Sequence, residues 1–118
     1  MENIIANKSL FFAIRIVKLY KHLNENKKEF VLSKQLLRCG TAIGALIKEA
    51  EHAQSKADFL NKMNIALKEA NETVYWLLLL KETEYLSEAE FLSIKVDAEE
   101  LLKLLISIVK TTKTKLNK

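Results

Sequence analysis

The chain of 118 residues contains no proline and only two glycines. An all-β domain needs turn-forming residues at intervals of roughly 8–12 positions, and this chain does not supply them. Hydrophobic residues make up 49% of the sequence and charged residues 29%, a balance that allows one buried core at this length. The sequence therefore predicts a single all-α domain over residues 1–118.

Four segments carry apolar residues at the spacings of three and four that are typical of amphipathic helices. They lie at about residues 7–24, 33–54, 55–82 and 87–112. Ser33, Ser55 and Ser87 stand where helix N-caps are expected. Strict spacing and short connections favour an antiparallel up-down four-helix bundle with left-handed, coiled-coil-like packing. The basic tail 113–118 loses the pattern and is expected to fray.

The second segment contains Gly40 and Gly44, four positions apart. Each glycine costs about 1 kcal/mol of helix propensity relative to alanine, so a compensating interaction is expected. The sequence predicts that a neighbouring backbone approaches the helix closely at these two positions.

Two of the four segments carry more apolar surface than one bundle can bury. The first has a second apolar stripe, and the third has large side chains roughly opposite its core seam. Such off-core residues are typical of interface centres and favour a homo-oligomer. Alternatively, the first helix is simply the most buried one and Trp76 covers a loop. The predicted interface residues are Phe12, Ile16, Leu19, Leu23, Ile65, Trp76 and Leu79.

The residues that could carry catalysis are few. Glu49 and His52 have the Glu-x-x-His spacing of di-iron bundles, but a second pair is absent and this pair points away from the apolar side. Cys39 lies on the apolar seam without an activating partner. Two histidines and two glycines do not supply a catalytic triad or a phosphate-binding loop. The sequence predicts no enzyme, no cofactor and no metal.

The cysteine count and the length of the apolar runs also indicate where in the cell the protein is expected. A single cysteine cannot form an internal disulfide, so a cytoplasmic protein is expected. The longest apolar run, 74–80, has seven residues, whereas a membrane-spanning helix needs about 20. No membrane partner is expected.

The charges are segregated along the chain. The net charge is +6 over residues 1–48, −7 over residues 49–102 and +5 over residues 103–118, which contain no acid. If the basic faces of the first two helices lie side by side, they form a phosphate-binding surface that an oligomer repeats in every subunit. The candidate nucleic-acid-binding residues are Lys8, Arg15, Lys18, Lys34, Arg38 and Lys48.

A less specific interpretation of these charges stays open. Arg38, Lys34 and Lys48 could instead pair with acids of the third helix, such as Glu69 and Glu72. No aromatic residue interleaves the basic residues as a base-stacking platform would require, so sequence-specific recognition of nucleic acid is not supported.

Two longer motifs resemble a known bacterial family. The first is Leu-Ser-Lys-Gln-Leu-Leu-Arg-Cys-Gly-Thr-Ala-Ile-Gly-Ala at 32–45, followed by Glu49-Ala50 and Ser55-x-x-Asp58-Phe59. The second is Lys-Met-Asn-Ile-Ala-Leu-Lys-Glu-Ala-Asn-Glu-Thr at 62–73, followed by Tyr75-Trp76-Leu77. The sequence is similar, from about Lys8 to about Thr112, to four-helix bundle proteins first noticed as reading frames in intervening sequences of the large-subunit ribosomal RNA gene.

This resemblance implies a cytoplasmic four-helix bundle that assembles as a ring, with a pentamer as the expected form, and that has no known catalytic activity. A related branch, the accessory proteins of diversity-generating retroelements, is a basic pentameric barrel that binds nucleic acid and a reverse transcriptase. The family offers no functional residues to transfer.

Together, these observations predict a non-enzymatic homo-oligomer whose basic faces bind RNA or DNA through phosphate contacts, as an accessory to a nucleic-acid enzyme. The alternative is an oligomeric scaffold that binds a protein partner and does not bind nucleic acid.

Overall fold

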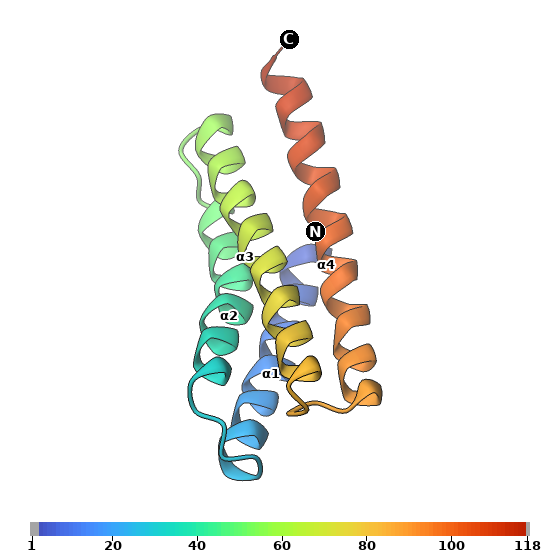
Figure 1. Ribbon diagram of the computed structural model, residues 1–118. Helices are drawn as coiled ribbons and strands as arrows, with labels where there is room; N and C mark the ends of the chain where they lie inside the picture. Colours follow the sequence, from blue (N-terminus) through green and yellow to red (C-terminus); the bar gives the residue numbers. More distant parts are fainter. Residues whose placement is uncertain (1–2, 118) are drawn as a thin grey trace.

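The computed structural model describes residues 3–117, and these fold into four α-helices without a strand. The helices are α1 (Ile4–Glu25), α2 (Leu32–Ala50), α3 (Lys56–Glu82) and α4 (Glu88–Leu116). They form an elongated bundle with extents of 50 × 25 × 21 Å (Figure 1). The predicted all-α four-helix bundle is thereby confirmed. None of the helices in the described part is long and apolar enough to cross a membrane.

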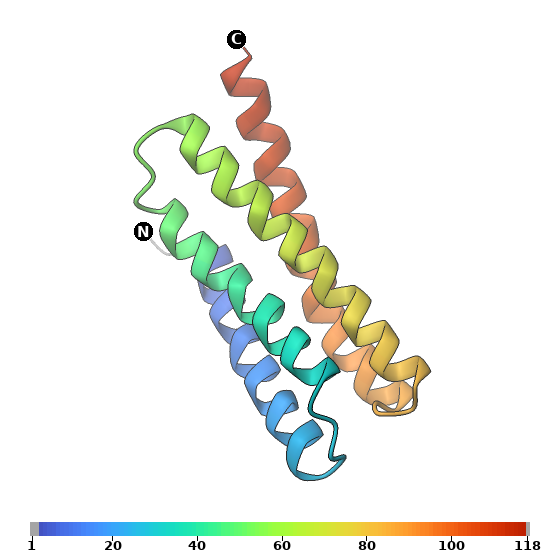
Figure 2. The same cartoon turned by 60° about the vertical axis from the view of Figure 1, so that its left-hand side comes forward.

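The bundle consists of two helical hairpins, α1–α2 and α3–α4, which pack together mainly through α2 and α3 (Figure 2). Residue numbers that rise along α1 fall along the facing α4, as in the pairs Lys8–Glu100 and Arg15–Asp97. Among the four neighbouring helix pairs, α1 and α4 make the fewest contacts. The seam between α1 and α4 is therefore the least closed side of the bundle, and the handedness of the packing stays a prediction.

Two of the three predicted helix caps are confirmed. The Ser55 side chain accepts the backbone N–H of Asp58 at 3.0 Å and starts α3. The Ser87 side chain accepts the backbone N–H of Glu90 at 3.1 Å, and the Glu90 carboxylate accepts the backbone N–H of Ser87 at 2.8 Å. This reciprocal capping box satisfies donors that the first turn of α4 would otherwise leave unpaired.

The third predicted cap, Ser33, is wrong. Helix α2 begins one residue earlier, and Ser33 is buried inside it. The carboxylate of Glu29 caps α2 instead, because it accepts the backbone N–H groups of Val31 at 2.9 Å and of Ser33 at 3.3 Å, and also that of Leu32. A charged acceptor at a helix N-terminus is favoured by the helix dipole, which explains why it can replace the serine.

The helix ends also differ from the prediction. Helix α2 ends at Ala50 rather than at Gln54, and α4 continues to Leu116 rather than fraying after Thr112. The hydroxyls of Thr112 and Thr114 donate to carbonyls four residues earlier, at 2.7 and 3.0 Å. Lysines in the last turn of α4 interact favourably with the helix dipole, so a basic end need not unwind. Residue 118, the last of the predicted frayed tail, lies outside the described residues.

The two glycines of α2 face α1 closely. The predicted approach of a neighbouring backbone is found at Gly44, whereas the nearest atoms to Gly40 belong to the Ile16 side chain. A Cβ atom added to Gly40 would lie 2.9 Å from the Ile16 side chain. A Cβ atom added to Gly44 would lie 3.3 Å from the Ser9 Oγ and 3.5 Å from the Ser9 backbone oxygen. The missing side chains therefore allow α1 and α2 to pack closely.

The stripe of α1 that was predicted as surplus is in fact its core face. Phe12, Ile16 and Leu23 are buried, and Leu19 is half-buried. Both stripes of α1 are apolar enough to form a core, so the spacing alone could not decide between them. The large apolar residues that α1 leaves exposed are Ile4, Leu10, Phe11 and Ile14.

Candidate functional site

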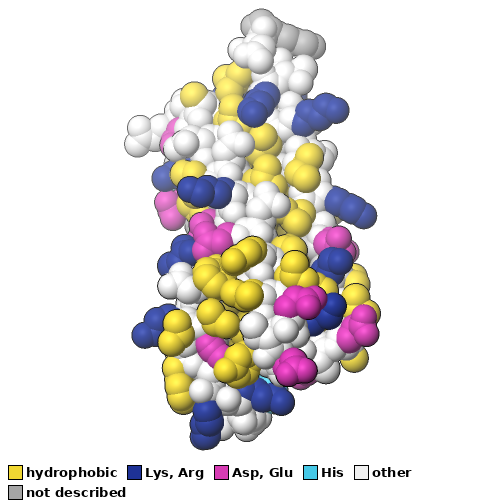
Figure 3. All heavy atoms as spheres, in the orientation of Figure 1, with side chains coloured by type: hydrophobic (Ala, Val, Ile, Leu, Met, Phe, Trp, Pro, Cys, Tyr) yellow, Lys and Arg dark blue, Asp and Glu magenta, His cyan; other side chains and the backbone are white. Residues whose placement is uncertain are grey.

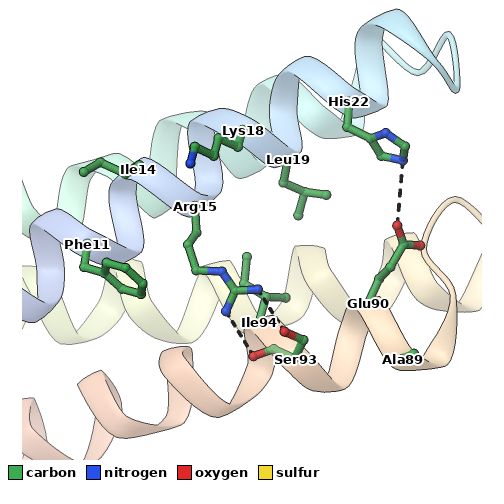
Figure 4. A pocket seen from close by; sticks show the side chains of 10 residues that line it. All are labelled: Phe11, Ile14, Arg15, Lys18, Leu19, His22, Ala89, Glu90, Ser93 and Ile94. Atoms are coloured by element: carbon green, nitrogen blue, oxygen red, sulfur yellow. Dashed lines mark hydrogen bonds and ion pairs between the residues drawn. The ribbon is translucent and has the colours of Figure 1, made fainter.

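The open seam between α1 and α4 forms a groove of about 690 Å³. Apolar side chains from both helices line it, among them Phe11 and Leu19 from α1 and Ile94 from α4 (Figure 4). Arg15, Lys18 and His22 stand along the α1 side of the groove.

Charged and polar side chains bridge this groove. Arg15 donates to the Oγ and the backbone oxygen of Ser93, at 2.9 and 3.2 Å (Figure 4). It also donates to Asp97 Oδ2 at 2.7 Å. His22 Nε2 lies 3.8 Å from Glu90 Oε2 and has no hydrogen-bond partner. Exposed or half-exposed ion pairs contribute little to stability, so the α1–α4 seam is held more weakly than an apolar interface would be.

The opposite seam, between α2 and α3, contains a denser polar network. Arg38 pairs with Glu69 at 3.1 Å and also with Glu72. Trp76 Nε1 donates to Glu72 Oε2 at 3.0 Å, and the Trp76 ring meets Tyr75 edge-on with centroids 5.2 Å apart. This network holds Trp76 half-buried against the bundle.

Of the three residues predicted as interface anchors on α3, Ile65 is exposed, whereas Trp76 and Leu79 are half-buried. Their part in an interface stays a prediction. Figure 3 shows hydrophobic side chains gathered over α3 and α4 on one face of the bundle. Large apolar residues are exposed in the C-terminal half of α3 and in the N-terminal half of α4. They are Tyr75, Leu78, Leu92 and Val96, here named the α3–α4 patch.

Most of the six basic candidates are engaged with acids. Lys8 pairs with Glu100, Arg15 with Asp97, Arg38 with Glu69 and Glu72, and Lys48 with Glu51 at 3.5 Å. Lys18 and Lys34 are exposed and have no ion pair in the described part of the chain. Of the alternative pairings with acids of α3, only that of Arg38 with Glu69 and Glu72 is found among the described residues, since Lys48 pairs with Glu51 instead. The structure therefore does not bring the six residues together as one open basic surface.

Other lysines are better placed for phosphate contacts. Lys103, Lys110, Lys113 and Lys115, here named the α4 lysines, are exposed and lack ion pairs among the described residues. The sequence signal that identifies them is the absence of any acid after Glu100.

The remaining candidates for chemistry are Cys39, Glu49 and His52, and the structure does not bring all three together. Cys39 is buried, its Sγ donates to the Leu36 carbonyl at 3.6 Å, and burial raises the pKa of its thiol. Glu49 pairs with Lys62 at 3.3 Å, and His52 is exposed. Within residues 3–117, no three His, Cys, Asp or Glu side chains come together as a metal site.

Comparisons with known proteins agree with this architecture. The sequence matches the family model described as 23S rRNA-intervening sequence protein over residues 1–107. It is 63% identical to a protein of unknown function from the S23 ribosomal protein family of Bacteroides thetaiotaomicron, whose crystal structure superposes with a TM-score of 0.89. The alignment covers 90% of this chain and 98% of that one. No curated protein matches the sequence. This chain belongs to the 23S rRNA-intervening sequence protein family.

Proposed function

We propose that the protein is a non-enzymatic, cytoplasmic bundle that assembles with copies of itself and binds nucleic acid through phosphate contacts, as an accessory to a nucleic-acid enzyme. The observation that carries the binding proposal is the acid-free second half of α4. Four exposed lysines follow Glu100 there, and no acidic side chain neutralises them in the described structure. Clustered lysines release counterions from a nucleic-acid backbone, which favours binding of any sequence.

Self-assembly is supported by apolar surface on two different sides of the bundle. One side is the α1 patch, defined as Leu10, Phe11 and Ile14, and the other is the α3–α4 patch. A closed ring needs two distinct surfaces on each subunit, because the front of one copy meets the back of the next. The pentamer implied by the family resemblance is the expected ring, and it would repeat the α4 lysines in every subunit.

Fluorescence anisotropy tests the nucleic-acid part. A labelled structured RNA and a labelled duplex DNA are titrated with the wild type and with a triple variant, Lys110→Gln, Lys113→Gln and Lys115→Gln. We expect wild-type binding that weakens steeply with salt, and a shallower salt dependence for the variant, by about one unit of slope per lost contact. Lys68→Gln, an exposed lysine on α3, serves as the matched control. Equal binding by the triple variant would exclude the α4 lysines as the contact surface.

A second candidate function is an oligomeric scaffold that binds a protein partner and no nucleic acid. The observation that favours it is the pairing of Lys8, Arg15, Arg38 and Lys48 with acids of the same chain. The same titration separates the two candidates, because a scaffold would bind neither RNA nor DNA even at low salt.

A further inference from the structure

The connection between α1 and α2 exposes two apolar side chains on a fixed backbone. Phe30 is 56% exposed and Val31 is 74% exposed. The Glu29 carboxylate, itself buried, holds the backbone N–H groups that follow it, and the Glu29 N–H donates to the Leu23 carbonyl at 2.9 Å. Lys28 adopts a left-handed backbone conformation with φ of 55°. The connection is therefore a tightly bonded turn that presents an aromatic ring to solvent.

A hollow of about 300 Å³ lies beside this ring. It is lined by the connection, including Phe30, and by Tyr85 from the turn between α3 and α4. That second turn is also fixed, because the backbone N–H groups of Tyr85 and Leu86 donate to the Leu80 carbonyl, at 2.9 and 3.2 Å. Two aromatic residues from two hydrogen-bonded turns thus border one open hollow.

The charges around the hollow favour an anionic ligand. Lys28 lines the hollow itself. Lys27 precedes it in the same connection and Lys34 lies in the first turn of α2, and all three are exposed without an ion pair among the described residues. The nearby carboxylate of Glu29 is occupied by backbone donors. Glu84, next to Tyr85 in the sequence, is exposed and adds a negative charge to the turn between α3 and α4. A polyanion would therefore approach from the side of the lysines.

We propose that this hollow binds an unstacked base of a single-stranded nucleic acid, with Phe30 as the stacking surface and with Lys27 and Lys28 on the adjacent phosphates. The inference rests on the proposed binding of nucleic acid. It adds a second contact, at the end of the bundle opposite the α4 lysines (Figure 1), that favours a single strand or an open loop over a duplex. Bases in a duplex are stacked on each other and cannot reach an aromatic side chain. The sequence has no aromatic residue among the six basic candidates. Phe30 lies instead beside Lys27 and Lys28, which were not among them.

Anisotropy titrations with three labelled probes of equal length test this inference: a single-stranded RNA, the corresponding duplex, and a single strand without bases. Stacking on one aromatic side chain contributes roughly 5- to 150-fold in affinity. We expect Phe30→Ala to lose about that factor for the single strand and to bind the duplex and the abasic strand as the wild type does. Phe30→Tyr keeps the aromatic ring and is expected to retain single-strand binding. Phe30 is exposed enough that its removal leaves the core intact.

The outcomes separate this inference from the function on which it rests. If the wild type binds none of the probes at low salt, the proposed nucleic-acid function fails and the base site fails with it. If the wild type binds but Phe30→Ala is unchanged, or weakens all three probes equally, only the base site is overturned. Sedimentation with vesicles rich in phosphatidylserine provides the remaining comparison. Phe30-dependent binding to the vesicles, with unchanged RNA binding, would identify the exposed turn as a membrane contact and overturn the proposal.

Discussion

The two seams that face each other across the bundle are built differently. The α2–α3 seam has a guanidinium shared by two carboxylates, one of them nearly buried, and an indole bonded to the same network. The α1–α4 seam has a groove of about 690 Å³, bridged by side chains that remain partly in water. One sequence thus produces a closed side and an open side.

This difference indicates which side of the bundle has apolar surface available for association. The closed seam joins the two hairpins, so residues there are needed for folding. The open seam leaves apolar side chains such as Phe11 exposed at 59%, although their burial would be favourable. We therefore expect substitutions at the closed seam to change stability, and substitutions at the open seam to change association.

The largest expected effect comes from truncating the core. Leu36 on α2 is fully buried, so Leu36→Ala should lower the free energy of unfolding by about 2–5 kcal/mol. Phe11→Ala removes a larger but exposed side chain and should cost less than about 1 kcal/mol in the monomer. Urea denaturation of both variants at low protein concentration measures the contrast. Equal losses would show that the two sides of the bundle are equally closed.

A smaller effect is expected at the contact of α1 with α2. Gly40→Ala places a methyl group 2.9 Å from the Ile16 side chain, which is fully buried and cannot move away freely. Overpacking of this kind costs about 1–3 kcal/mol, which exceeds the gain of about 1 kcal/mol in helix propensity. Gly44→Ala is the matched control, since its nearest contact would be 3.3 Å. Thermal unfolding should rank Gly40→Ala below Gly44→Ala, and the reverse order would contradict the packing described.

The arginines of the two seams provide a direct comparison. Arg38→Met should lower the free energy of unfolding by about 1–3 kcal/mol, because it leaves the nearly buried Glu69 carboxylate without its cation. Arg15→Met removes a partner from Asp97, which is more exposed, and should cost no more than about 1 kcal/mol. Chemical denaturation at neutral pH measures both values. A larger loss for Arg15→Met would reverse the assignment of the closed and open sides.

The smallest expected effect is a pH dependence of stability at the end of the α1–α4 seam where α4 begins. The backbone N–H of Ser87 bonds to the Glu90 carboxylate and lowers the pKa of Glu90 below its ordinary value of 4.5. A lowered pKa in the folded state stabilises the protein above pH 4.5, and this contribution is lost as the pH falls through the folded-state value. Glu90→Gln should therefore flatten the acid limb of a stability-against-pH curve, whereas Glu99→Gln, an exposed position outside the cap, should not.

Much of this structure could be predicted from residue spacing. The number of helices and the caps at Ser55 and Ser87 follow from local patterns that act within one turn of helix. The cap at Ser33 could not be predicted in this way, because the acceptor is a carboxylate from the preceding connection. The prediction for the core face of α1 was wrong, since two apolar stripes compete and only the position of the neighbouring helices selects one.

The candidate site was less predictable than the fold. Spacing shows that Arg15 and Arg38 lie on helix faces, but not that acids of α4 and α3 stand opposite them. The hollow beside Phe30 depends on two connections that are more than fifty residues apart in the sequence. Local patterns contain no information on such contacts. Net charge by segment, in contrast, did indicate the basic second half of α4.

The most direct test of this account is the native mass of two variants and of their mixture, measured by light scattering coupled to size exclusion. We expect a pentamer of the 13.6 kDa chain for the wild type, and single subunits for Phe11→Glu in the α1 patch and Leu78→Glu in the α3–α4 patch. An equimolar mixture of the two variants should form a two-subunit complex, because each contributes one intact patch. A wild type that remains at 13.6 kDa, or a mixture that remains monomeric, would contradict assembly through these two patches.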